Sequence, residues 1–177
     1  MRLPVPAFRL LPRYKAALTS RSSMSYVASI DQGTSSSRVC IYDVKCNLVG
    51  FHQLEHTQFF PAPGHVEHNA LDIYKNVKTC MEEAMKMANA SSKDIKALGI
   101  TNQRETTVVW NKRTGKPYHN AIVWNDSRTA DICERVASEG GKDRLRAKTG
   151  LPISPYFSAS KIHFLLANVP VLRIDSL

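Results

Sequence analysis

The chain has 177 residues, of which 43% are hydrophobic, and this is enough for one domain with a sizeable core. Its net charge is +9, but five of its basic residues and none of its acidic residues lie in residues 1–24. The remainder is only mildly basic and has no basic stripe with interleaved aromatic residues, so the sequence does not favour nucleic-acid binding. It also has no apolar run long enough to predict a membrane span.

Residues 1–24 form a leader that is rich in Arg, Leu, Ser and Pro. Such a composition is typical of mitochondrial or plastid transit peptides. An unstructured extension, or translation from a start upstream of a true first residue at Met24, would give the same composition. The leader therefore leaves the localisation open between cytoplasm and mitochondrion.

Alternating apolar residues and polar turns predict three consecutive strands after the leader, at Tyr26–Asp31, Arg38–Asp43 and Leu48–Thr57. Short strands joined by tight turns form an antiparallel meander. The first turn has an unusual composition, because the segment Asp31-Gln32-Gly33-Thr34-Ser35-Ser36-Ser37-Arg38 holds one carboxylate, one glycine and four hydroxyls.

This hydroxyl-rich hairpin suits a metal-bound polyphosphate. Glycine lets the backbone approach a ligand closely, and backbone N–H groups and hydroxyls can bind phosphate oxygens. Asp31 can hold a hydrated Mg²⁺, which prefers few protein ligands and many waters. An ordinary hairpin turn uses the same residue types, so the hairpin alone leaves both interpretations open.

A helix and a further strand are predicted next. Asn69 is a good N-cap, and apolar residues recur at three- and four-residue spacing from Ile73 to Ala88. Ile95–Thr101 is predicted to be a buried strand. Three antiparallel strands, a helix and a returning strand make an α/β sheet with a right-handed crossover.

The second half of the chain is predicted to contain shorter elements. We expect two strands, at Thr106–Trp110 and Ala121–Trp124. Three helices should follow: one capped by Ser127 and running through Ser138, a short one at Lys142–Lys148, and Ala159–Asn168 with Ser158 as its N-cap.

The cysteines and histidines form no recognised metal motif. None of the four cysteines belongs to a Cys-x-x-Cys pair, which predicts reduced thiols in an intracellular protein. The segment His65-Val66-Glu67-His68, with His56 upstream, gathers three histidines and a carboxylate. Its spacing matches no standard zinc pattern, so we expect no zinc site there.

Two loops at strand ends have the polar content of a small-molecule site. In the first, Arg104 can donate to hydroxyls and Glu105 can accept from them, which suits a small polyol. In the second, Trp124 can pack against the carbon backbone of such a ligand. A surface salt bridge between Arg104 and Glu105, together with a core tryptophan, would explain the same residues.

Taken together, these segments resemble the amino-terminal part of the glycerol kinases, a branch of the carbohydrate-kinase family. The similar segments occur in the family's order and cover about Ser25 to Val169, which leaves 170–177 as a divergent tail. They are Ile30–Arg38, Pro61–His68, Gly99–Thr107, Thr114–Pro117, Asn120–Trp124, Thr149–Pro152 and Pro155–Ser158.

The resemblance implies a ribonuclease-H-like, actin-like ATPase fold of the α/β class, with two domains and a cleft. It also implies transfer of the γ-phosphate of ATP to the 3-hydroxyl of glycerol with Mg²⁺ as cofactor. Residues carried over from the family are Arg104, Glu105, Trp124 and Tyr156 for glycerol, Thr34, Ser35, Ser36 and Arg38 for the nucleotide phosphates, and Asp31 for the hydrated metal. Thr34 and Arg104 should then face a common crevice.

The chain departs from the family in length. The rest of the first domain, the second domain and the loop with the catalytic aspartate have no counterpart here, so we expect an incomplete fold and little or no kinase activity from this chain alone. The resemblance further implies ATP/ADP and glycerol as partners and a homo-oligomeric full-length form. Two alternatives to a glycerol kinase remain: a related sugar kinase, and a non-catalytic module that binds glycerol or a partner.

Overall fold

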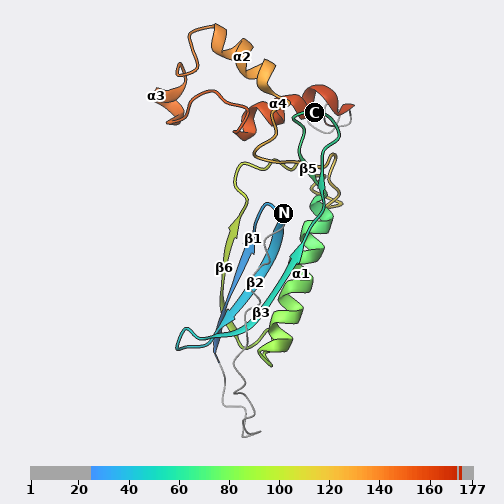
Figure 1. Cartoon of the computed structure of the whole chain (residues 1–177), viewed down its shortest axis with the longest axis vertical. Coiled ribbons are helices and arrows are strands. Elements are labelled where there is room, and N and C mark those ends of the chain that lie inside the picture. The colour runs from blue at the N-terminus through green and yellow to red at the C-terminus, as the bar shows by residue number, and fades with distance from the viewer. Residues whose placement is uncertain (1–24, 171, 173–177) are drawn as a thin grey trace, which may run out of the picture.

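The computed structural model describes residues 25–170 and residue 172, so the leader and most of the tail lie outside the described residues. Its largest unit is a four-stranded sheet with the strand order β3-β2-β1-β6 and one long helix, α1, packed against it (Figure 1). The bounds are β1 Tyr26–Gln32, β2 Ser36–Tyr42, β3 Leu48–Glu55, α1 Ala70–Met87 and β6 Ile95–Asn102.

The antiparallel meander β1-β2-β3 confirms the predicted first unit. Its first turn closes through a hydrogen bond from the Gly33 N–H to the Ser36 carbonyl, 2.9 Å long. Residue alternation in β1 and β2 buries one side of each strand, including Ala28 and Val39. The polar turn therefore stands at the end of a well-packed sheet.

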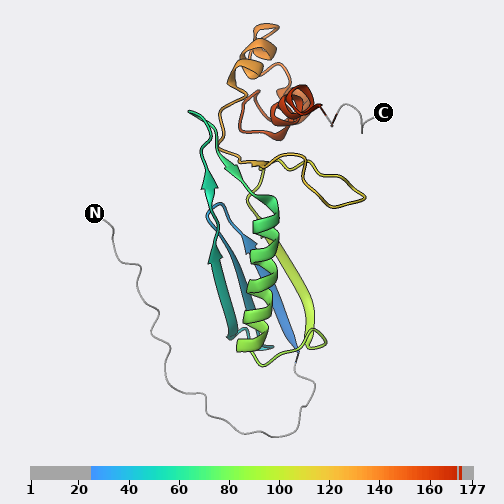
Figure 2. The same ribbon diagram turned by 90° about the vertical axis from the view of Figure 1, so that its right-hand side faces the viewer.

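Helix α1 begins as predicted, with the Asn69 side chain accepting a hydrogen bond from the N–H of Leu71. Its apolar face covers β2 and β3, where Cys80 and Ala84 are fully buried in the main core. Gly50 of β3 permits a very close approach, because a Cβ at this position would lie 2.2 Å from the Ala84 carbonyl oxygen. Figure 2 shows α1 lying along the sheet.

Strand β6 pairs in parallel with β1, as the predicted α/β sheet requires, but the prediction that it is buried is wrong. It is the edge strand of the sheet, and α1 packs mainly on β2 and β3. Leu98 and Ile100 are consequently 48% and 69% exposed. The apolar composition of this strand predicted its conformation but not its surroundings.

A second, smaller sheet has the order β4-β5-β7 and consists of Gln58–Phe59, Glu67–His68 and Ala121–Ile122. The predicted strand at Thr106–Trp110 is wrong as a continuous element. Only Thr107 and Trp110 form isolated bridges, to Ile122 and Pro117. The ladder cannot extend further because β7 is only two residues long.

Three helices stand beyond one end of the main sheet: α2 Ala130–Ser138, α3 Arg146–Thr149 and α4 Ser158–Asn168 (Figure 1). A helix occurs in each predicted region, but α3 is only four residues long and lies later than the predicted Lys142–Lys148. Ser127 and Ser158 do not cap α2 and α4. The Ser127 hydroxyl donates to the Gly64 carbonyl, and the Ser158 hydroxyl donates to the Glu105 carbonyl. Both serines connect distant loops, which local propensity does not report.

The four cysteines are all free thiols in the structure. Within residues 25–170 and residue 172, no helix has the length and apolar character needed to cross a bilayer.

Candidate functional site

A crevice of about 310 Å³ opens where the turn after β1 meets the loop after β6. Residues from four separate segments line it: Gly33, Thr34, Asn102, Gln103, Arg104, Glu105, Trp124 and Tyr156. The predicted common opening for Thr34 and Arg104 is therefore present. All four residues expected to contact glycerol and one of the four expected to contact phosphate contribute to this crevice.

A hydrogen bond joins the two predicted halves of the site. The indole N–H of Trp124 donates to the Thr34 hydroxyl over 2.9 Å. The Trp124 ring also lies beside the Tyr156 ring, with centroids 5.7 Å apart and planes inclined by 60°. Trp124 is thus half-buried and forms an aromatic wall together with Tyr156, whereas the alternative expectation placed it in the core.

Arg104 and Glu105 lie side by side at the crevice without an ion pair between them among the contacts that the structure describes. Glu105 has a φ of 60°, in the left-handed region that non-glycine residues rarely adopt. Its Oε2 atom is buried and makes no protein hydrogen bond. Such a backbone conformation, together with an unsatisfied carboxylate oxygen, is typical of a ligand site.

Gln103 also lines the crevice, although it was not among the predicted site residues. Its side-chain amide nitrogen donates to Gln32 Oε1 and to the Gly33 carbonyl, and its Oε1 accepts from the Thr106 hydroxyl. Only 8% of the residue is exposed. The available signal was its place directly after a strand and next to Arg104.

Comparison with known proteins identifies the family. Residues 26–174 match the FGGY family of carbohydrate kinases, N-terminal domain. The chain belongs to this family. Glycerol kinases of Azorhizobium caulinodans and Chloroflexus aggregans are 50% and 51% identical to this FGGY chain over 148 residues, or 84% of it. The chain spans about 30% of the length of these curated relatives.

Solved structures of other family members agree with the fold of this FGGY chain. Plasmodium falciparum glycerol kinase with ADP is similar to it with a TM-score of 0.78 and 36% identity, over 85% of this chain and 30% of that protein. A xylulose kinase from Brucella ovis, 22% identical, has a TM-score of 0.74 over 83% of this chain and 30% of that protein, and shows the fold alone. The predicted family and actin-like α/β fold are confirmed.

The other residues of this FGGY chain that were predicted to bind phosphate or the metal do not line the crevice. They lie in the same hairpin as Thr34, which does line it. Ser35 is exposed in the turn, and the Ser36 hydroxyl accepts a hydrogen bond from Gln53 over 3.0 Å. Arg38 and Asp31 are cross-strand partners and form an ion pair. The Asp31 side chain is 40% exposed, so this single carboxylate remains accessible to a hydrated Mg²⁺ and fits such a group.

Two histidines pack behind the hairpin turn. The His56 ring contacts the His68 ring edge to face, with centroids 4.8 Å apart, and His56 Nε2 lies 2.9 Å from the Thr34 carbonyl. Burial, with a smaller contribution from the charge of His56, lowers the pKa of His68 to about 4. No cluster of three or more candidate metal ligands occurs in the described part of the chain.

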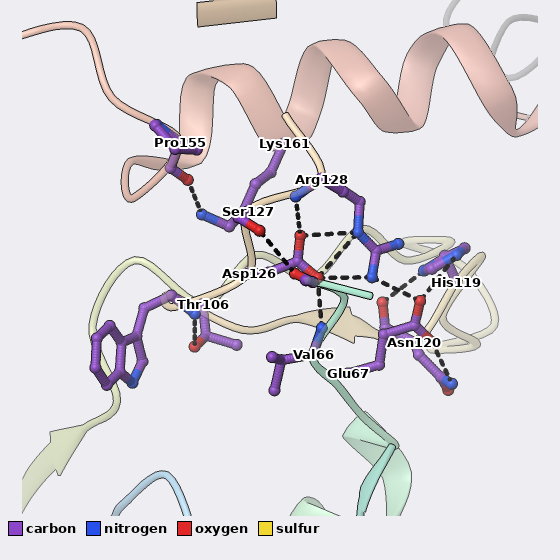
Figure 3. Close-up of polar contacts among 12 residues, drawn as sticks. Val66, Glu67, Thr106, His119, Asn120, Asp126, Ser127, Arg128, Pro155 and Lys161 are labelled. Atoms are coloured by element: carbon purple, nitrogen blue, oxygen red, sulfur yellow. Dashed lines mark hydrogen bonds and ion pairs between the residues drawn. The ribbon is translucent and has the colours of Figure 1, made fainter. Parts of the chain in front are cut away.

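A buried ionic network connects Glu67, Asp126 and Arg128 of the FGGY domain (Figure 3). Arg128 binds Asp126 through two nitrogens and reaches Glu67 over 2.9 Å. Burial alone would raise the pKa of Asp126, but hydrogen bonds from Arg128 and from the Val66 N–H hold it below its ordinary value. The sequence did not predict this network, because Glu67 lies 61 residues away from Arg128 in the chain.

Proposed function

We propose that the crevice binds glycerol and that this chain forms the substrate-binding part of a glycerol kinase. The observation that carries the proposal is the common opening of the predicted polyol and phosphate residues, joined by the hydrogen bond from Trp124 to Thr34. The curated relatives of about 50% identity, which are named glycerol kinases, support the choice of substrate.

The residue chemistry of the crevice matches a three-carbon triol. Arg104 offers several N–H donors in a rigid plane, and Glu105 offers acceptor oxygens, so adjacent hydroxyls can be bound from two sides. Trp124 and Tyr156 supply the apolar surface that would pack against the carbon chain. The unpartnered Glu105 oxygen supports a ligand hydroxyl as its hydrogen-bond partner.

The hydroxyl-rich hairpin is proposed as the phosphate-binding side. Thr34, Ser35, Ser36 and Arg38 would contact the phosphates of ATP or ADP, and the solved relative with bound ADP supports a nucleotide ligand. Asp31 would hold Mg²⁺ through water, and the ion supplies charge neutralisation when it is bound. Phosphoryl transfer depends mainly on positioning and charge, which is what the side chains of this crevice would contribute.

Calorimetry with glycerol tests the proposed site on the chain itself. We expect measurable binding to the parent chain and none to Arg104→Ala, because the principal donor to the hydroxyls is removed. Arg113→Ala is the matched control, since Arg113 is exposed in a turn outside the crevice. Unchanged binding by Arg104→Ala, or binding of xylulose in preference to glycerol, would reject the proposed site or its substrate.

A further inference from the structure

Lys161 of α4 is a buried cation that the proposed binding chemistry does not use. It is 0% exposed, whereas lysines are almost never fully buried unless they are paired. The ion pairs of the described residues do not include it. Burial lowers its pKa below the ordinary value, opposed by the nearby charge of Asp126. A buried ammonium without a direct carboxylate partner needs a structural or functional reason.

The partners of this ammonium lie in the segment that carries one wall of the crevice. Lys161 Nζ donates to the carbonyl of Pro155 and, over 3.0 Å, to the carbonyl of Tyr156. Figure 3 shows the Lys161 side chain extending from α4 to Pro155, beside the ionic network. Two successive carbonyls bound by one ammonium fix the orientation of the peptide between them, and therefore the direction in which the Tyr156 ring leaves the backbone.

The same helix also contacts a second lining residue of the crevice, Glu105. Ser158 donates to the Glu105 carbonyl over 3.2 Å, next to the strained backbone of that residue. Thus one turn of α4 contacts the main chains of both Glu105 and Tyr156. Without the ammonium, these two half-buried carbonyls would lose their donor and the segment before α4 could rotate.

We propose that Lys161 is a positioning residue, which fixes the Tyr156 ring against Trp124 and so shapes the ligand end of the crevice. The identity of the ligand as glycerol rests on the proposed function, but the positioning of the two rings does not. No contact between Lys161 and the ligand is required. The role differs from a general contribution to stability, because it predicts a local change at Trp124.

Fluorescence and near-ultraviolet circular dichroism of Trp124 test the positioning directly. In a Trp110→Phe background, Trp124 is the only tryptophan of the full chain. We expect Lys161→Met to reproduce the spectral change caused by Tyr156→Ala in the absence of any ligand. Thr129→Val is the matched control, since it removes a part-buried hydrogen bond to Ser160 of α4 and leaves the Pro155 and Tyr156 carbonyls untouched.

Two results would overturn the proposal: a parental Trp124 spectrum in folded Lys161→Met, or an equal change in Thr129→Val. If Lys161→Met does not fold, nitrogen-15 NMR of lysine side chains in the parent decides the question. We expect a Lys161 ammonium that exchanges its protons slowly, with a resonance displaced by Tyr156→Ala. Exchange as fast as that of surface lysines, or a resonance unaffected by Tyr156→Ala, would contradict the proposal.

Glycerol affinity provides the functional readout. In calorimetry we expect Lys161→Met to weaken binding by about tenfold, as the loss of hydrogen bonds from a charged donor implies. Parental affinity in a variant with an altered Trp124 spectrum would contradict a role in the crevice. Absence of glycerol binding by the parent would instead reject the proposed function, while the Trp124 spectra would still decide the role of Lys161.

Discussion

At the scale of single residues, the stability of the fold should depend on the buried charge of Arg128. Its side chain is 3% exposed and lies between Asp126, 0% exposed, and Glu67, 9% exposed. Arg128→Met would remove the charged donor to both carboxylates, leaving Asp126 with backbone donors only and Glu67 with Asn120 and the more distant His119. We expect it to lower the free energy of unfolding by about 3–5 kcal/mol. Urea denaturation followed by far-ultraviolet circular dichroism measures this loss.

Arg146 provides the control for that substitution. It pairs with Asp143 at the surface, where the two side chains are 54% and 52% exposed. Because solvent screens such a pair, Arg146→Met should cost less than about 1 kcal/mol. Similar losses in the two variants would show that burial of the Arg128 network has no special effect on stability.

His68 makes stability depend on acidity. Its pKa is about 4 in the folded chain against an ordinary value of 6.5, so between these pH values the unfolded state binds a proton that the folded state does not. The free energy of unfolding should therefore fall by about 3 kcal/mol as the pH is lowered from 6.5 to 4. His68→Gln, which cannot titrate, should show a smaller fall in urea denaturation at matched pH values. An identical fall in both chains would exclude His68 as the cause.

At the scale of secondary-structure elements, contact between β3 and α1 depends on the missing side chain of Gly50. A methyl group there would meet the Ala84 carbonyl oxygen at 2.2 Å, so Gly50→Ala should destabilise the fold by about 1–3 kcal/mol through overpacking. Gly99→Ala in β6 is the control, since nothing lies within 4 Å of its added methyl group. Thermal denaturation compares them, and equal midpoints would contradict the close approach.

The meander and α1 could be predicted from the sequence because their determinants are local. Polar turns separate β1, β2 and β3, and Asn69 precedes a long apolar periodicity. The Thr106–Trp110 strand was overestimated because a ladder also needs a partner of sufficient length, and β7 does not provide it. Ser127 and Ser158 have the residue type of a cap, but their hydroxyls bind carbonyls that only the tertiary fold brings near.

The crevice was predictable to a similar degree. Thr34, Arg104 and Glu105 follow strands β1 and β6, which are parallel neighbours, so the loops after them must meet at one edge. The same reasoning gives no access to Lys161, since a lysine in a helix is normally exposed and its burial follows from long-range packing. Residues that line the crevice are thus easier to predict than the buried residue packed behind it.

At the scale of the whole molecule, the main sheet is covered unevenly. Leu98 and Ile100 of β6 lie in register with the buried Ala28 and Ile30 of β1, on the side of the sheet that α1 occupies. The helix packs mainly on β2 and β3 and lies along the sheet (Figure 2). Leu98 and Ile100 therefore remain exposed on the edge strand β6. Exposed apolar edges of this kind promote association between chains.

We therefore predict that the chain self-associates and that β6 is responsible. Sedimentation velocity should show an average mass that rises with concentration, and Ile100→Lys should shift this rise to higher concentration by placing a charge on the edge strand. Val44→Lys is the matched control, because Val44 is 78% exposed in the turn between β2 and β3 and lies outside β6. An equal effect of the two lysines would reveal a general effect of added charge, and a parent chain of constant mass would contradict the prediction.

Because Ile100 is 69% exposed, urea denaturation should give the same stability for Ile100→Lys as for the parent. This measurement separates a change in association from a change in unfolding.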